Sequence, residues 1–79
     1  MTRDSLEITI NRRRFGAAEG VLPVMTAANI AGLAGVPADN AIVEREIARN
    51  TYEPVTGEIP IAMKSGMHFL VTRHFVMGG

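Results

Sequence analysis

Residues 67–72 read Met-His-Phe-Leu-Val-Thr and give the strongest strand signal in the sequence. Successive side chains of a strand point to opposite faces of the sheet. The pattern predicts a strand with Met67, Phe69 and Val71 on the core face and His68, Leu70 and Thr72 on the other. A turn at Lys64, Ser65 and Gly66 precedes it.

A second alternation, over residues 6–11, predicts the first strand of the same sheet. Leu6, Ile8 and Ile10 share one face of it. Three arginines, Arg12 to Arg14, follow where the chain is expected to turn. Residues 15–25 then return as an irregular second arm, broken by Gly16, Gly20 and Pro23. The sequence therefore predicts an opening hairpin.

One short helix is predicted directly after this hairpin. Thr26 is a good N-cap, and the apolar positions that follow have helical spacing: Ala27, Ile30, Ala31 and Ala34. Gly35 suits the residue just past the helix end, and Pro37 cannot continue a helix. We expect this helix to need a sheet to pack against, since Gly32 weakens it.

The region between the helix and the last strand holds two further predicted strands. Residues 41–47 begin apolar and become alternating, which indicates a third strand. Residues 48–57 are predicted to form a loop, and Ile59 and Ile61 around Pro60 a short edge strand. The fold class is therefore α+β, with a mixed sheet of four to five strands packed on one short helix. The helix crossover allows a later strand to run parallel to the first.

Length, charge and cysteine content limit what the chain can do. Seventy-nine residues form one small domain, and eight basic residues balance eight acidic ones, so nucleic acid is a poor partner. The sequence has no cysteine, which excludes disulfides, thiolate metal sites and a cysteine nucleophile within it. No window is apolar enough for a membrane span and no signal peptide is recognisable, so we expect a cytoplasmic protein without membrane contact.

The sequence ends in Gly78 and Gly79, after the strand and the apolar residues Phe75, Val76 and Met77. Two residues without Cβ form a thin strip that can thread a narrow channel. The carboxylate of Gly79 would then be a reacting group delivered to another protein's active site. We expect no metal site in this chain, because it contains neither an HxH or HExxH motif nor an acidic cluster.

This order of elements, with a last strand that leads to Gly78 and Gly79, resembles the ubiquitin-like β-grasp family. Residues 67–71 are similar to the last strand of ubiquitin, which also has a histidine between apolar residues. Residues 8–11 (ITIN) and 30–37 (IAGLAGVP) resemble bacterial multiubiquitin-type domains, which are encoded beside activating, conjugating and deubiquitinating enzymes. The resemblance implies a β-grasp domain over residues 1–72 and a flexible tail over residues 73–79.

The resemblance also implies a function, that of a protein modifier. In this family an activating enzyme uses ATP and magnesium to adenylate the terminal carboxylate and binds it as a thioester, and a conjugating enzyme transfers it to a target protein. A deconjugating peptidase reverses the attachment. Such a modifier is a substrate of these enzymes, so the resemblance implies that this chain has no catalytic residue and binds no cofactor itself. Lys64 is the only lysine, so it is the one side chain to which another copy of the modifier could be joined through a lysine amine. Amide and ester linkage to target proteins both remain open.

Partner contacts are expected at the tail and on the last strand. The expected tail contacts are Arg73, His74, Phe75, Val76 and Met77. The tail of ubiquitin has arginines between leucines, so this more apolar tail implies a more apolar enzyme groove, with Phe75 and Met77 as its anchors. His68 and Leu70 form either a recognition patch, as in ubiquitin, or an ordinary half-covered strand face.

Two other functions fit the same residues. A sulfur carrier shares the fold, the size and the double glycine, and its terminal carboxylate becomes a thiocarboxylate. An interaction domain with an inert terminus is the second alternative. The run Arg12 to Arg14 either contacts an acidic partner or forms a solvated turn, and the neutral total charge favours the turn.

Overall fold

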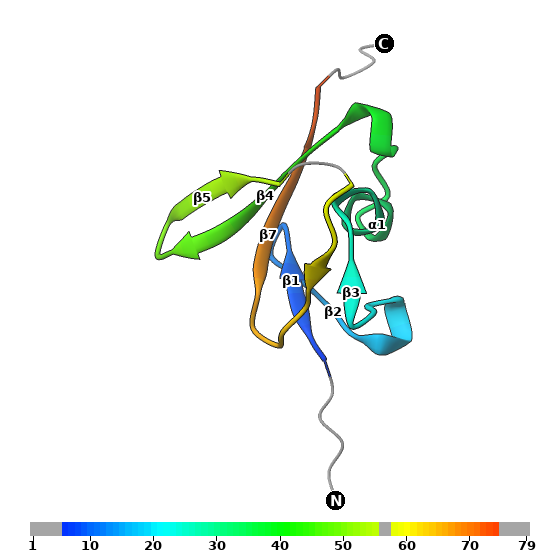
Figure 1. Cartoon of the computed structure of the whole chain (residues 1–79), viewed down its shortest axis with the longest axis vertical. Coiled ribbons are helices and arrows are strands. Elements are labelled where there is room, and N and C mark those ends of the chain that lie inside the picture. The colour runs from blue at the N-terminus through cyan, green and yellow to red at the C-terminus, as the bar shows by residue number, and fades with distance from the viewer. Residues whose placement is uncertain (1–5, 56–57, 75–79) are drawn as a thin grey trace, which may run out of the picture.

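A mixed five-stranded sheet with one α-helix on one face forms the body of the chain (Figure 1). The computed structural model describes residues 6–55 and 58–74. The sheet has the strand order β2-β1-β7-β4-β5, and a two-stranded ribbon, β3-β6, lies outside it. The elements are β1 (Ile8–Ile10), β2 (Arg13–Phe15), η1 (Ala17–Glu19), β3 (Val24–Met25), α1 (Ala27–Leu33), η2 (Ala38–Asn40), β4 (Ala41–Ala48), β5 (Thr51–Pro54), β6 (Ile61–Ala62) and β7 (His68–Arg73). The predicted α+β class is confirmed.

The last strand, β7, lies in the middle of the five. It runs parallel to β1, with Thr9 opposite His68, and antiparallel to β4, with Val43 opposite Val71. Phe69 and Val71 are buried on one face while His68 and Thr72 are exposed on the other, as their alternation predicts. The predicted parallel pairing of a late strand with the first is confirmed as well.

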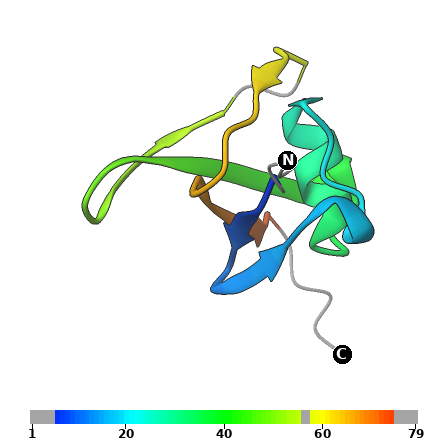
Figure 2. The ribbon, with the colours of Figure 1, turned by 90° about the horizontal axis from the view of Figure 1, so that it is seen from below.

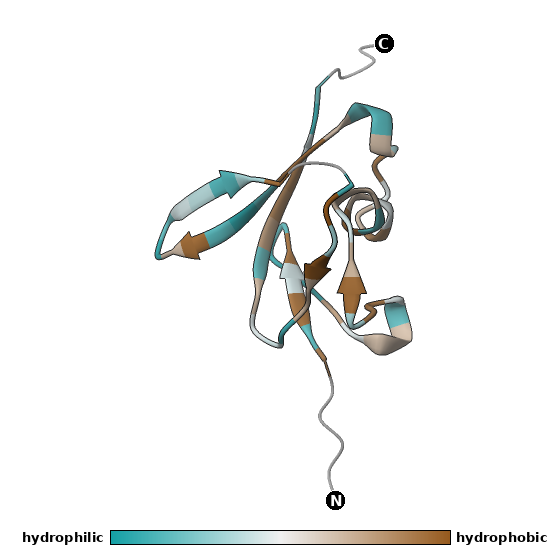
Figure 3. Cartoon of the chain, in the orientation of Figure 1, coloured by the Kyte–Doolittle hydropathy of each residue, from teal (hydrophilic) through white to brown (hydrophobic). Residues whose placement is uncertain are grey.

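Helix α1 covers one face of the sheet and leaves the other open (Figure 2). The core between the helix and the sheet is built from Ile8, Ile10, Phe15, Val21, Met25, Ala27, Ile30, Ala31, Val36, Val43, Ile61, Met63, Phe69 and Val71. Hydropathy follows this division in Figure 3, where the strand residues alternate and the hairpin of β4 and β5 is largely hydrophilic. The face turned away from α1, which we call the open face, is therefore available to solvent.

The helix begins and ends where its sequence predicts. The Thr26 hydroxyl accepts a hydrogen bond from the Asn29 amide, and the Asn29 side chain accepts one from the Thr26 amide. This reciprocal cap satisfies two amides that a helix N-terminus leaves unpaired. At the other end Gly35 has φ +79°, a conformation that glycine adopts without steric cost.

The first hairpin turns earlier than the sequence predicts. Its two turn residues are Asn11 and Arg12, both with positive φ, while Arg13 and Arg14 belong to β2. A two-residue turn with positive φ at both residues matches the right-handed twist of the two strands that it connects. The expected second arm over residues 15–25 is wrong: β2 ends at Phe15, and β3 leaves the sheet to pair with β6, Val24 opposite Ala62.

The prediction of a loop over residues 48–57 is also wrong. Residues 51–54 form β5, the edge strand of the main sheet, and a turn with Asn50 at φ +59° connects it to β4. The predicted short strand near Ile61 exists as β6, but it belongs to the separate ribbon. The fifth strand of the sheet therefore comes from a stretch in which the sequence shows no strand.

The side chain of Asn11 extends the pairing between β1 and β7. Its amide nitrogen donates to the Val71 carbonyl at 3.0 Å, and its amide oxygen accepts from the Val71 amide at 2.9 Å. The Asn11 backbone amide also donates to the Phe69 carbonyl. Because the side-chain amide replaces a backbone peptide group here, β7 keeps its hydrogen bonding beyond the end of β1.

We expect Asn11→Gly to lower the free energy of unfolding by about 2 kcal/mol, because it removes two hydrogen bonds worth about 1 kcal/mol each. Glycine tolerates the positive φ, so backbone strain adds nothing to this loss. Arg12→Gly is the matched control, since it makes the same change in the same turn. It should leave stability within about 1 kcal/mol of the original. Urea unfolding measures both, and equal losses would contradict the role of the Asn11 side chain.

Candidate functional site at the end of the last strand and on the open face

The first two residues of the predicted tail are hydrogen-bonded to the body. Arg73 is the last residue of β7 and lies opposite Ala41. The His74 amide donates to the Asn40 carbonyl at 2.9 Å, and an Arg73 guanidinium nitrogen lies 3.5 Å from the Gly35 carbonyl. The chain is thus held, up to residue 74, beside the end of α1 and the short helix η2.

The remaining candidate tail residues lie outside the described part of the chain. They are Phe75, Val76, Met77, Gly78 and Gly79. The structure gives the position from which they continue, at the end of the central strand.

His68 and Leu70 lie on the open face, as their alternation predicts. His68 is exposed and Leu70 is partly buried. Thr9 lies opposite His68 on β1, and Glu44 lies opposite Leu70 on β4. Both residues line a hollow together with Thr9, Arg12, Arg14, Asn50, Tyr52 and Phe69. The structure therefore brings the candidate residues of the last strand together with two of the arginines of the first hairpin.

The three consecutive arginines separate onto different faces. Arg14 lies opposite Thr9 in the ladder and lines the open-face hollow with Arg12. Arg13 instead has its guanidinium carbon 5.4 Å from the centre of the Phe15 ring. Since Phe15 is a buried residue of the core, Arg13 covers the edge of the core by a cation–π contact. Only two of the three arginines thus contribute to the open face.

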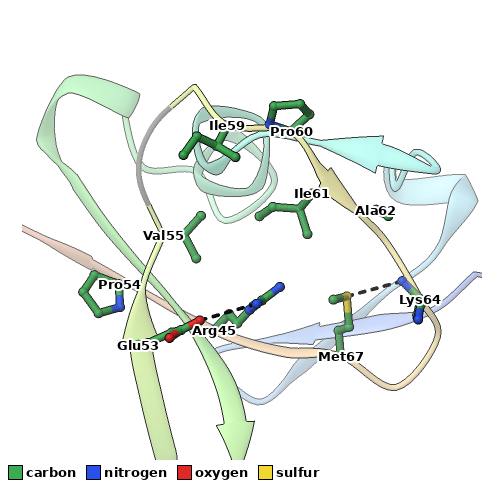
Figure 4. A pocket seen from close by; sticks show the side chains of 10 residues that line it. All are labelled: Arg45, Glu53, Pro54, Val55, Ile59, Pro60, Ile61, Ala62, Lys64 and Met67. Carbon is green, nitrogen blue, oxygen red and sulfur yellow. Dashed lines mark hydrogen bonds and ion pairs between the residues drawn. The ribbon is translucent and has the colours of Figure 1, made fainter.

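Lys64 lies at the other end of β7, in a groove on the helix side of the sheet (Figure 4). The groove, of about 490 Å³, is lined by Arg45, Glu53, Pro54, Val55, Ile59, Pro60, Ile61, Ala62, Lys64 and Met67. Arg45 of β4 and Glu53 of β5, which lie opposite each other in the sheet, form an exposed ion pair in one wall of the groove at 3.4 Å. At about 3.3 Å per residue, six-residue β7 puts roughly 20 Å between Lys64 and His74. The possible acceptor amine therefore lies far from the start of the tail.

The groove could not be found from the sequence, because one of its walls is β5, which lies where a loop is predicted. In the described ranges 6–55 and 58–74, no three His, Asp or Glu side chains gather as a metal site requires. The helices of that same part of the chain are too short and too polar for any of them to cross a bilayer.

The described residues define a class, that of small α+β domains with a mixed five-stranded sheet and one helix. Comparisons of this chain with protein-family models, with curated proteins and with solved structures found no match in any of the three.

Proposed function

We propose that this chain is a ubiquitin-like protein modifier with a β-grasp fold, conjugated to its targets through the carboxylate of Gly79. The observation that carries the proposal is the course of β7. This strand lies in the centre of the sheet, is bonded to β1 and β4 on its two sides, and leads toward Phe75, Val76, Met77, Gly78 and Gly79 in the sequence. A rigid body with its last residues as the reacting end is what a modifier requires.

The strand order supports the β-grasp part of the proposal. In that fold the first and last strands pair in parallel at the centre, and the single helix connects the opening hairpin to the next strand of the sheet. Here β1 and β7 pair in parallel, and α1 lies between the β1–β2 hairpin and β4. The fold resemblance drawn from the sequence and this observed order agree.

The chemistry belongs to the partners of such a modifier. The carboxylate oxygen of Gly79 attacks the α-phosphorus of ATP, with magnesium, in the activating enzyme, and pyrophosphate leaves. A cysteine thiolate of that enzyme then displaces AMP and forms a thioester. Transfer to an amine or hydroxyl of a target protein by a conjugating enzyme releases the thiol, and a deconjugating peptidase reverses the attachment. The residues of this chain present the carboxylate and take no proton.

The contacts that the enzymes would use are the tail and the open face. Arg73, which is exposed, and His74 mark the start of the tail, and Phe75 and Met77 are proposed as its apolar anchors. His68 and Leu70 are proposed as contacts on the open face. Lys64 is a possible self-acceptor, exposed at the far end of the domain.

Mass spectrometry of the intact chain and of its enzyme adduct distinguishes the proposed modifier from a sulfur carrier. We expect purified chain, activating enzyme, ATP and magnesium to give an enzyme adduct that survives denaturation and is released by a thiol reductant. Serine in place of the enzyme's cysteine should remove that adduct. Chain isolated from its native cells with sulfur in place of one terminal oxygen would overturn the modifier proposal in favour of a sulfur carrier. Absence of both products would leave an inert interaction domain.

A further inference from the structure

The groove shown in Figure 4 has the edge of strand β6 along one wall. β6 pairs with β3 in an antiparallel ribbon, with Ala62 opposite Val24. The Met63 amide donates to the Pro23 carbonyl at 2.8 Å, so Met63 occupies a hydrogen-bonded position of this ribbon. Because bonded and non-bonded pairs alternate along an antiparallel ladder, Ala62 is in a non-bonded pair. Its amide and carbonyl therefore point away from β3.

The Lys64 amide shows that this outer edge of β6 faces the groove. Lys64 comes two residues after Ala62, so its amide points to the same side of the chain. It donates to the Met67 sulfur at 3.3 Å, and all three residues line the groove (Figure 4). In the part of the chain that the structure describes, β3 is the only strand that pairs with β6. The Ala62 amide and carbonyl are thus available to an incoming backbone.

The side chains of the groove favour an apolar occupant with one negative charge. Every lining residue other than Arg45, Glu53 and Lys64 is apolar, and Ile59 among them is 59% exposed. Arg45 and Glu53 neutralise each other as an ion pair. Lys64 is exposed, and no carboxylate of residues 6–55 or 58–74 forms an ion pair with it. The groove therefore has one positive charge without a counter-ion, beside apolar surface that remains in contact with water.

We propose that this groove binds an extended segment of a partner protein, which adds a strand to the outer edge of β6 and places an acidic side chain against Lys64. Strand addition to an open sheet edge is a general mode of peptide recognition. Backbone hydrogen bonds supply its affinity, and alternate side chains supply its specificity. From Pro60 to Lys64 the edge is roughly 13 Å long, so about five partner residues cover it.

The register of β6 determines the order of side chains in that partner segment. We expect an antiparallel partner, since antiparallel pairs are slightly more stable per residue than parallel ones. Its residue opposite Ala62 exchanges two backbone hydrogen bonds, and its residue two positions earlier lies opposite Lys64 on the same face. The partner residues opposite Met63 and Ile61 point to the other face, on which these two side chains are buried. The segment should therefore read acidic, apolar, any residue, apolar.

Two synthetic peptides test the proposal in nuclear magnetic resonance titrations of the folded chain. One is acetyl-Ser-Glu-Val-Ser-Val-Ser-amide, and the other has lysine in place of glutamate. We expect the acidic peptide to bind with a dissociation constant of about 1 mM or below. It should move the backbone amide resonances of Ala62, Lys64 and Met67 and leave those of Arg12 and Arg14 on the open face in place. The lysine peptide should bind roughly fivefold more weakly.

Lys64→Glu reverses the charge of the groove without changing its apolar lining. It should weaken binding of the acidic peptide by roughly fivefold or more and make the lysine peptide the tighter of the two. Arg49→Glu is the matched control, because Arg49 is an exposed cation of the β4–β5 turn and does not line the groove. It should leave both dissociation constants within about twofold of the original. Far-UV circular dichroism verifies that each variant is folded.

A third peptide tests strand addition without any change to the protein. An N-methyl group on the serine that lies opposite Ala62 removes the donor for the Ala62 carbonyl, so binding should weaken by roughly fivefold or more. No binding at about 5 mM acidic peptide would overturn the proposal. Equal binding of the acidic and lysine peptides, full binding of the N-methyl peptide, or an effect of Arg49→Glu equal to that of Lys64→Glu would each overturn it as well. Conjugation enters none of these measurements, so the proposed function is tested separately.

Discussion

Phe69→Ala is expected to lower the free energy of unfolding by about 3–5 kcal/mol. Phe69 lies on β7 with 1% of its surface exposed, and it is the largest of the fully buried side chains. Truncation removes its apolar contact area and leaves a cavity that a well-packed core fills only in part. At about 0.05–0.15 kcal/mol per residue, a domain of 79 residues has only roughly 4–12 kcal/mol of stability. The variant should therefore lose a quarter or more of its stability and unfold at a much lower denaturant concentration.

Urea unfolding followed by circular dichroism measures this loss, and Leu70→Ala is the matched control. Leu70 is the next residue of the same strand but lies on the open face, partly buried. Its truncation should cost about 1 kcal/mol or less, because its surroundings are already hydrated. Comparable losses for the two variants would contradict the assignment of the buried and open faces of β7.

The sequence predicts β7 and α1 correctly because their signals are local. In β7 the buried residues Phe69 and Val71 alternate with residues that are exposed or only partly buried, and this matches the alternation in the sequence. In α1 the cap residue Thr26 and the terminal Gly35 each lie within one turn of the helix end that they determine. Where the residues that specify an element lie inside it or next to it, the sequence is sufficient.

The sequence does not predict β5, because an edge strand needs little of what marks a strand. Its residues are Thr51, Tyr52, Glu53 and Pro54, with no apolar alternation. Pro54 is tolerated because an edge strand needs hydrogen bonds on one side only. The strand forms because β4 is long enough to extend past β7 and offer it a partner, and this depends on the tertiary structure.

The candidate sites divide in the same way. Alternation along the strand predicts on which face His68 and Leu70 lie. It does not predict which charged and aromatic residues of other strands lie on the same face. Arg14 comes from β2, Glu46 from β4 and Tyr52 from β5, and only the strand order brings them into one row. The double role of Asn11 in β1–β7 pairing likewise depends on a residue sixty positions away. The sequence is enough to select the candidate residues, but the strand topology determines which residues lie beside them.

Deletion of Gly79 is expected to remove every covalent adduct of the chain. Protein that ends at Gly79, tagged at its N-terminus and expressed in its native cells, should appear in denaturing gels as free chain and as a set of larger conjugates. The deletion draws the terminal carboxylate back by about 3.5 Å, the reach of one extended residue. Adenylation requires the carboxylate oxygen within about 3–3.5 Å of the phosphorus that it attacks, so this shift abolishes the first step rather than slowing it.

Lys64→Arg is the control that separates loss of conjugation from loss of one acceptor. It keeps the positive charge in the groove but removes the only lysine amine, so it should eliminate conjugates joined through Lys64 and leave those with other targets. Lys64 lies roughly 20 Å along β7 from the start of the tail, so we expect Lys64→Arg to have no direct effect on adenylation of the terminal carboxylate. Gly79→Ala should give fewer conjugates than Lys64→Arg but more than the Gly79 deletion. The added Cβ makes the last residue wider for an enzyme channel but does not move the carboxylate. Conjugates that persist without Gly79 would show that the reacting group lies elsewhere in the chain, and the proposed function would then be wrong whatever the fold.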